Sequence, residues 1–263
     1  MFVTIINDCR DGNAFGRQAT RAMALFNAPV TTIGIDQDEF EASGNLVDML
    51  DASEGEEGVI LVNVAPRHGR GKKWPNGTPF GYFTVGKTLI VASVDGLTLS
   101  LVKKLGILKE FNLFDIPTVT EAMVASGDLS DSQRAHIINT QFRSYDFVPH
   151  VAAWLKEGKD VPSEAYPLEN IPDAPKAVWF IDNFGNCKTS IGPSDVDFEP
   201  GKVVKTLIGD LTCYNRLKDV PNGEPGLIIG SSGYGQFRFL EVVLQGQSAA
   251  KHFNLSVGTI LLG

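Results

Sequence analysis

Short apolar runs and helical patterns alternate through the first half of the chain. Residues 2–6, 30–35 and 59–64 are apolar runs of strand length, and residues 14–26 and 40–50 between them carry apolar side chains at helical spacing. Strands that alternate with helices favour a parallel sheet with helices packed on both of its faces. We therefore predict an α/β domain with a mainly parallel sheet in the N-terminal half.

The pattern changes after residue 158. Residues 159–176 are rich in proline and carboxylates and show no period, which is typical of a linker. Beyond them, short strand-like runs are separated by turn signals, which favours a small β-barrel or a sandwich. The predicted organisation is an α/β domain over residues 1–158, a linker over 159–176 and an all-β domain over 177–263.

Composition and charge narrow the classes of partner. The net charge is −8 over 263 residues, and no long basic run is present, which disfavours nucleic acid because phosphate binding needs a clustered positive face. No apolar stretch is long enough to predict a membrane span, and no secretory signal is visible. The three cysteines are widely spaced and no histidine pair has metal-ligand spacing, so we expect neither disulfides nor a metal. A cytoplasmic location is the default expectation.

Polar residues stand at the ends of two predicted strands. Asp8 ends the first strand, where a carboxylate can accept the hydroxyls of a ribose or, equally, stabilise a helix N-terminus. His68 lies in a long glycine-rich loop after the third strand and is either a site residue or a solvated side chain. The chain lacks both G-x-G-x-x-G after the first strand and G-x-S-x-G, so a dinucleotide fold and a serine hydrolase are disfavoured.

Two turns in the second half carry more polar groups than a turn needs. The stretch FIDNFGNCKTSIG, residues 180–192, interrupts a strand with carboxylate, amide and glycine residues around Phe184. It is either a hairpin corner or part of a binding site. The stretch GSSGY, residues 230–234, offers serine hydroxyls and amide N–H groups to a carboxylate, or is a flexible turn.

Sequence motifs through most of the chain resemble one enzyme family. The run DVPNGEPGLIIGSSGY followed by FLEVVLQGQSAA resembles the C-terminal signature of the S-adenosylmethionine (SAM) hydroxide adenosyltransferases, whose fold the fluorinases and chlorinases share. FIDNFGNCKTSIG resembles the Asp-x-Phe-Gly-Asn-x-x-Thr motif of that family. Near the N-terminus, IINDCRDGNAFG is similar to its ribose-binding strand end, and TQFRSYDFVPHVAAWL is similar to the helix that closes its first domain.

This resemblance implies a fold and a reaction. The family combines an N-terminal α/β domain with a C-terminal β-barrel, so a barrel is the expected form of residues 177–263. Its active site lies between the subunits of a homotrimer, where water or halide attacks the 5′ carbon of SAM and expels methionine. No cofactor is expected beyond this small-molecule substrate. In the N-terminal domain the resemblance places Asp8 at the ribose hydroxyls, and we assign Asn13 and Asp95 to the same substrate site.

The resemblance also assigns substrate contacts in the C-terminal domain. Asp182 and Asn186 would fix the methionine end and the adenine edge, and Phe184 would line the pocket. Ser231 would meet the carboxylate of the amino acid, and the backbone around Val243 would face the adenine.

The chain departs from the family where the nucleophile is activated. Ala65 replaces the Asp of an Asp-Pro-Gly after the third strand, and Phe142 stands where a His is expected. The remaining candidates for positioning water are His68, Arg67 and Arg143. Residues 235–239 are additional to the family pattern, beside the expected adenine pocket, and could reshape it.

Three functions follow from these matches and departures. The leading prediction is a SAM hydrolase that releases adenosine and L-methionine. The second is a protein that binds SAM or adenosine without turning it over. The third is an adenosyl-transferring enzyme that uses another nucleophile, such as halide, or another adenosyl substrate.

Overall fold

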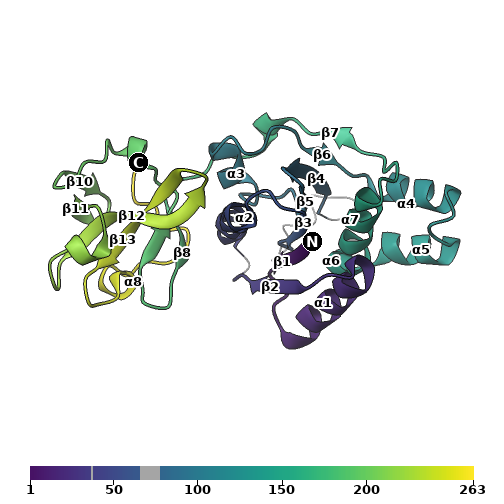
Figure 1. Cartoon of the computed structure of the whole chain (residues 1–263), viewed down its shortest axis with the longest axis horizontal. Coiled ribbons are helices and arrows are strands. Elements are labelled where there is room, and N and C mark those ends of the chain that lie inside the picture. The colour runs from purple at the N-terminus through teal and green to yellow at the C-terminus, as the bar shows by residue number, and fades with distance from the viewer. Residues whose placement is uncertain (37, 66–77) are drawn as a thin grey trace.

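The computed structural model describes residues 1–36, 38–65 and 78–263 (Figure 1). Its N-terminal half is built on a sheet with the strand order β2-β1-β3-β5-β4-β6-β7. The strands of this sheet are β1 (Phe2–Asn7), β2 (Val30–Gly34), β3 (Gly58–Asn63), β4 (Phe80–Val85), β5 (Thr88–Ser93), β6 (Asn112–Leu113) and β7 (Glu164–Ala165). No helix of the described residues is both long and apolar enough to cross a bilayer.

The N-terminal sheet is mixed rather than mainly parallel. Strands β2, β1, β3 and β5 run parallel to one another, as the alternating pattern predicts. Strand β4 is antiparallel to both β5 and β6, and β6 is antiparallel to β7. The physical reason is the short connection between β4 and β5, where Gly86 adopts a φ of 58° in a turn. Such a hairpin can join only antiparallel strands, because a parallel pair needs a longer crossover.

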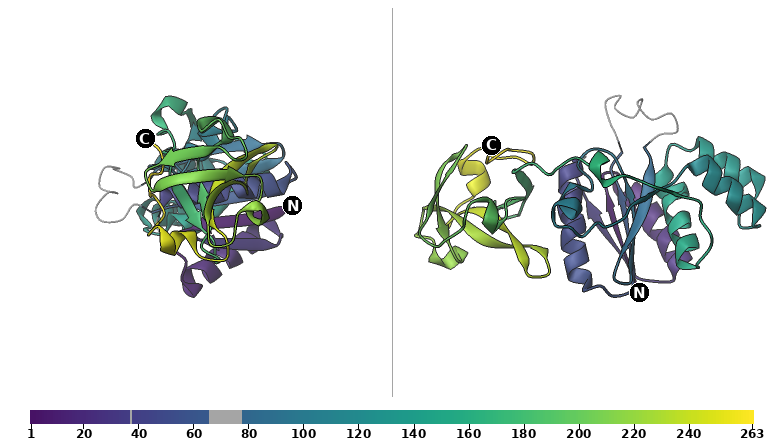
Figure 2. Two further views of the ribbon diagram at one scale, coloured as in Figure 1. Left: turned by 90° about the vertical axis from the view of Figure 1, so that its left-hand side faces the viewer. Right: turned by 90° about the horizontal axis from the view of Figure 1, so that it is seen from above.

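Helices cover both faces of this sheet. They are α1 (Gly12–Phe26), α2 (Glu39–Ser53), α3 (Ser100–Lys104), α4 (Ile116–Ala125), α5 (Asp131–Asn139), α6 (Arg143–Asp146) and α7 (Val148–Lys156). Val3 and Ile5 of β1 pack in one buried cluster with residues of α1 and α7, whereas Ile6 packs in another cluster with residues of α2 and α3. This alternation follows from the two-residue period of a strand. Figure 2 shows α2 and α1 on opposite sides of the sheet.

The C-terminal part forms a second sheet around its own core. The strand order is β10-β11-β12-β13-β9-β8, and a short helix, α8 (Ala249–His252), follows the last strand. The strands are β8 (Val178–Ile181), β9 (Cys187–Thr189), β10 (Val203–Thr206), β11 (Gly209–Tyr214), β12 (Pro225–Tyr234) and β13 (Phe237–Leu244). Strands β10 and β8 stand at the two edges of this order, so the sheet is confirmed but closure into a barrel is not.

The second sheet packs on helix α2 of the first half (Figure 1). Trp179 of β8 is buried in the same cluster as Phe40 and Leu46 of α2. Gly44 of α2 is required at this contact, because a Cβ there would overlap the Trp179 ring. The hairpin of β12 and β13 reaches the same helix. Its Gly235 donates a backbone hydrogen bond of 2.8 Å to Asp51.

Candidate functional site

The carboxyl ends of the parallel strands form one polar edge of the N-terminal sheet. Asp8 follows β1 and is only 6% exposed. Its carboxylate accepts hydrogen bonds from the Ala65 backbone N–H at 3.1 Å and from Asn63 Nδ2 at 3.5 Å. Asp8 therefore lies against the residue that replaces the family's Asp, at the strand end where α/β sheets bind ligands.

A buried amide network fixes this edge and was missed by the sequence reasoning. Asn7 is fully buried, and its Oδ1 accepts from Asn63 Nδ2 at 3.0 Å and from the Cys9 N–H at 2.9 Å. Asn7 Nδ2 donates to Gln18 of α1. The signal that could have found Asn7 and Asn63 is that each one ends an otherwise apolar strand. Asn7 and Asn63 are also paired across β1 and β3, which aligns them at the same level of the sheet.

Asp95 belongs to the same edge, and Asn13 lies in the first turn of the helix that follows β1. Asp95 follows β5, is 5% exposed, and accepts from the Gly96 N–H at 2.9 Å. Asn13 is exposed in the first turn of α1, where its N–H donates to the capping Asp11 at 3.0 Å. Asn13 lines a cavity of about 450 Å³ together with Arg17, among other residues. The structure thus brings Asp8 and Asp95 to one edge and places Asn13 on a helix surface.

The Asp182 turn connects β8 to β9 and is closed by its own polar groups. Asp182 Oδ1 accepts from the N–H groups of Phe184 at 2.8 Å and Asn186 at 2.9 Å, and Asp182 Oδ2 accepts from Asn186 Nδ2 at 2.9 Å. Gly185 has a φ of 86°, and its carbonyl accepts from the Ala250 N–H at 3.0 Å. These bonds hold the turn in one shape and direct Phe184 outward. The Phe184 side chain is 73% exposed.

A cavity of about 570 Å³ opens beside this turn. Its apolar lining comes from Phe184, Leu217 and Leu244, and its polar lining includes Asn186 and Gln245. All of its lining residues belong to the C-terminal part, so none comes from the edge that holds Asp8. An aromatic ring beside amide groups suits a flat heterocycle that also needs hydrogen bonds.

Val243 and Ser231 lie differently from the Asp182 turn. The Val243 side chain is fully buried in an apolar cluster with Ile228, while the neighbouring Leu244 lines the cavity. Ser231 is exposed, and its N–H donates to Glu241 Oε1 at 3.1 Å. The donor that the sequence assigns to a ligand carboxylate therefore faces a protein carboxylate.

The GSSGY stretch is not a turn, as the sequence suggests, but the irregular end of β12, where the register shifts between Ile229 and Gly233. The rest of this stretch docks onto helix α2. Ser232 Oγ donates to Asp48 Oδ2 at 2.8 Å, and the Gly233 N–H donates to Asp48 Oδ1 at 3.3 Å. The additional residues 235–239 continue this contact. Arg238 pairs with Asp51 at 3.1 Å.

The predicted water-positioning residues are only partly described. Arg67 and His68 lie outside the described residues. Arg143 begins α6, and its buried Nε has no hydrogen-bond partner among the described residues. Burial lowers the pKa of the Arg143 guanidinium from its ordinary value, yet an arginine stays charged at any physiological pH. Over the described ranges, no group of three His, Cys, Asp or Glu side chains is placed to hold a metal ion.

Comparison with known proteins identifies the part of the chain that holds both turns. Residues 176–261 match the SAM hydroxide adenosyltransferase C-terminal domain. The match confirms the resemblance found in the motifs, and it is consistent with a divergent member of that family. The chain is thereby linked to SAM-related adenosyl transfer or hydrolysis. Curated proteins offer no match to the chain.

Solved structures support the fold over nearly the whole length. An uncharacterized conserved protein from Thermotoga maritima matches with a TM-score of 0.65 and 19% identity, over 98% of this chain and 97% of that one. A conserved hypothetical protein from Thermus thermophilus matches with a TM-score of 0.63 and 19% identity, over 99% of both chains. At this identity the likeness shows a shared fold alone.

Proposed function

We propose that the protein cleaves SAM by nucleophilic attack at the ribose 5′ carbon, with water as the nucleophile, and releases adenosine and L-methionine. The observation that carries this proposal is the Asp182 turn, which lies inside the family-matched segment and lines a cavity with Phe184 and Asn186. The polar groups that shape the turn are satisfied internally. The ring of Phe184 remains available for a ligand, as does Asn186 Oδ1, which accepts no hydrogen bond among the described residues.

The proposed site needs both halves of the molecule. Asp8 and Asp95 supply carboxylates at the edge of the first sheet, which is suited to ribose hydroxyls, whereas Phe184 belongs to the second sheet. An exposed aromatic side chain next to a cavity is typical of a surface that is covered by a ligand or another subunit. We propose that the site is completed between the subunits of a homotrimer, with Phe184 of one chain facing Asp8 of the next.

The chemistry asks little of the protein beyond alignment. The sulfonium of SAM is a good leaving group, so no side chain has to protonate the departing methionine. Holding nucleophile, carbon and sulfur in line can supply about 7–11 kcal/mol of the barrier reduction. Exclusion of bulk water from the nucleophile contributes further. Arg67, His68 and Arg143 are the proposed residues for positioning water.

One observation keeps a second candidate function open. Ala65 offers no carboxylate where the family has an Asp, and its N–H donates to Asp8 instead. A protein with a retained adenosyl pocket and an altered nucleophile side could bind SAM without turnover, or could transfer the adenosyl group to a different nucleophile such as halide.

Product analysis separates these candidates. Purified protein is incubated with SAM, with and without halide, and adenosine, 5′-halo-adenosine and methionine are followed by mass spectrometry. The proposal expects equal release of adenosine and methionine, and strong loss of both in Asp8→Asn and Asp182→Ala. Asp210→Asn, at an exposed position of β11, is the matched charge control. Calorimetric binding without any product would instead favour the binding protein, and absence of binding to any adenosyl ligand would exclude all three candidates.

A further inference from the structure

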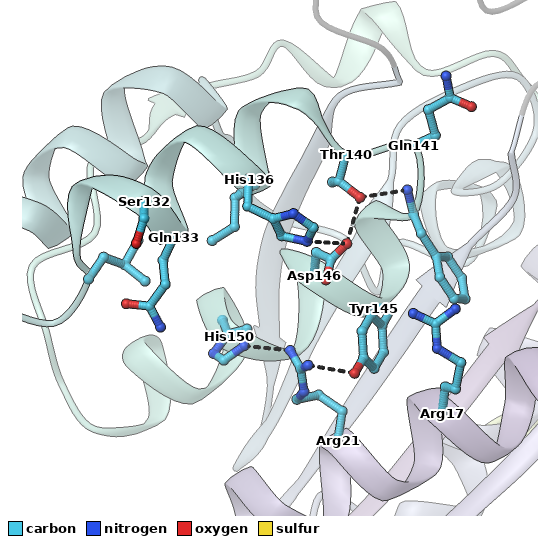
Figure 3. A pocket seen from close by; sticks show the side chains of 13 residues that line it. Arg17, Arg21, Ser132, Gln133, His136, Thr140, Gln141, Tyr145, Asp146 and His150 are labelled. Atoms are coloured by element: carbon cyan, nitrogen blue, oxygen red, sulfur yellow. Dashed lines mark hydrogen bonds and ion pairs between the residues drawn. The ribbon is translucent and has the colours of Figure 1, made fainter.

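A separate cavity of about 680 Å³ lies among helices α1, α5, α6 and α7 (Figure 3). Arg17 and Arg21 reach into it from α1, and Tyr145 and His150 line it from α6 and α7. Every residue that lines it belongs to the N-terminal half, whereas the cavity beside Phe184 is lined by the C-terminal part. The two cavities therefore share no residue.

Arg17 has no acidic partner among the described residues. Its guanidinium carbon lies 4.4 Å from the centroid of the Tyr145 ring and 5.0 Å from that of Phe142. These rings stack on each other at 5.5 Å and form a platform beneath the arginine. Stacking on a ring leaves the in-plane N–H donors of a guanidinium open to an incoming acceptor.

Within the described part of the chain, Arg21 is bonded only to neutral groups. Its Nη2 donates to the Tyr145 hydroxyl at 2.6 Å, and its Nη1 lies 2.8 Å from His150 Nε2. Because arginine can only donate, His150 Nε2 accepts and the imidazole is neutral. This agrees with the pKa of His150, which burial and then the nearby Arg21 charge lower from its ordinary value. Arg21 thus has no carboxylate partner among the described residues, and its orientation is fixed by two bonds.

The cavity contains one carboxylate among its lining residues, and that carboxylate is already engaged. Asp146 Oδ2 accepts from Thr140 Oγ1 at 2.5 Å and lies 3.3 Å from His136 Nε2. Among the described residues, Asp146 pairs with His136 and forms no ion pair with Arg17 or Arg21. Two arginines without a carboxylate partner thus converge in a hollow of a chain whose net charge is −8. Two arginines against one carboxylate leave an excess of positive charge in the lining, which attracts an anion.

We infer that this cavity binds a small ligand that carries an oxyanion, either a carboxylate or a phosphate. Arg21 is pre-oriented by Tyr145 and His150, and Arg17 is supported by two rings, so both donors are positioned before the ligand arrives. A guanidinium presents paired N–H donors that match two oxygens of a carboxylate or of a phosphate. None of the residues assigned to the proposed SAM pocket lines this cavity, and the inference does not depend on that proposal.

The inference is tested by calorimetry on the full chain with two probes, inorganic phosphate and succinate, each against sodium chloride at equal ionic strength. Saturable binding of either probe supports the site and names the anion class that it takes. Arg17→Gln is expected to weaken this binding about tenfold or more, because it removes a charge-assisted donor. Arg17→Lys, which keeps the charge, is expected to be affected less.

Controls separate a bound anion from a general charge effect. Arg17 makes no hydrogen bond or ion pair among the described residues, so Arg17→Gln should fold normally, which circular dichroism checks. Arg216→Gln removes an exposed arginine from the C-terminal part and should leave binding unchanged. The inference is overturned if neither probe binds, if chloride reproduces the heat, or if Arg17→Gln binds as tightly as the unaltered protein.

Discussion

The Asp182 turn and the GSSGY stretch both look like polar turns in the sequence, but in the structure the first is a turn and the second is the end of strand β12. Both lie within the family-matched segment, and both combine small polar residues with a positive-φ glycine, Gly185 or Gly233. The polar atoms of the Asp182 turn bond within the turn and leave Phe184 exposed beside a cavity. The donors of Ser232 and Gly233 instead bond to Asp48 of α2.

This difference distinguishes a segment suited to binding a ligand from a segment that joins the two halves of the protein. A turn that satisfies its own polar groups can present a side chain to a ligand without losing its shape. A segment whose donors bond to the other half of the molecule is stabilised by that half, and its hydroxyls already have a protein acceptor. We expect the Asp182 turn to control ligand affinity and the GSSGY stretch to control how the two sheets are held together.

The largest effect is expected where the Asp182 turn has no room for a side chain. In Gly185→Ala, the new Cβ would sit at a φ of 86°, would overlap Ser248 Oγ and would lie 2.9 Å from Ser248 Cα. Backbone strain of about 1–2 kcal/mol and overpacking of about 1–3 kcal/mol predict a loss of about 2–5 kcal/mol in the free energy of unfolding. Urea denaturation measures it.

Gly201→Ala is the matched control for this variant. Gly201 has the same φ of 86°, but a Cβ there would meet nothing within 4 Å. Only the strain of about 1–2 kcal/mol should remain. Equal losses in the two variants would show that the Ser248 contact does not hold the Asp182 turn.

The next largest effect on stability is expected where the GSSGY stretch contacts Asp48 of α2. Asp48→Ala removes the acceptor of Ser232 Oγ, the Gly233 N–H and Lys188 Nζ, which lies 3.2 Å from Asp48 Oδ2. Buried donors that lose their partner predict a cost of about 1–3 kcal/mol in the free energy of unfolding. Trp179 fluorescence is a suitable readout during denaturation, because this side chain packs against α2. The docking role is wrong if Asp48→Ala costs no more than Asp219→Ala, which breaks an exposed pair of about 0–1 kcal/mol.

Phe184→Ala distinguishes ligand affinity from stability. Because Phe184 is 73% exposed, the free energy of unfolding should change by less than about 0.5 kcal/mol. Stacking of a base on an aromatic ring is worth about 1–3 kcal/mol, so affinity for SAM should fall about tenfold or more. Calorimetric titration measures the affinity of the variant for SAM and for adenosine. An unchanged affinity would remove Phe184 from the proposed pocket, whatever the stability result.

The sequence predicts local features of this site well and contacts between distant segments poorly. Asp8 is correctly expected at the buried end of a strand, because an apolar run that stops at a carboxylate is visible in the sequence itself. The bonds of Asn7 and Asn63 depend on β1 and β3 being neighbours, which no local pattern states. The antiparallel pairing of β4 with β5, by contrast, follows from their short connection at Gly86, a local signal that the prediction of a mainly parallel sheet did not use.

The GSSGY stretch shows that contacts between the two halves of the molecule are equally hard to predict from sequence. Its hydroxyls and N–H groups are as suited to a ligand carboxylate as to Asp48, because the chemistry of the acceptor is identical. Only the position of α2 in space decides which carboxylate is nearby. A motif within one segment therefore predicts the kind of partner but leaves open whether the protein itself supplies it.

The smallest predicted effect tests whether the contact between the two halves extends beyond the GSSGY stretch to Asp195 and Lys104. Burial alone would raise the pKa of Asp195, but the Gly192 N–H at 2.8 Å and Lys104 of α3 at 3.0 Å outweigh it and lower the pKa below its ordinary value. A lowered folded-state pKa means that this stabilisation is complete above the unfolded value of about 3.9 and is lost as pH falls through the folded value. We therefore expect Asp195→Asn to cost about 0.5–1 kcal/mol at pH 7, since the amide still accepts from Gly192 and only the attraction to Lys104 is lost. The cost should shrink toward zero as the pH is lowered from 5 to about 3, because the unaltered protein then loses the same charge.

Urea denaturation across that pH range measures the cost of Asp195→Asn, with Asp210→Asn as the exposed control. A cost that stays constant with pH would mean that the Lys104 contact does not hold the second sheet against α3, and that Asp48 and Asp51 of α2 account for the polar part of the docking.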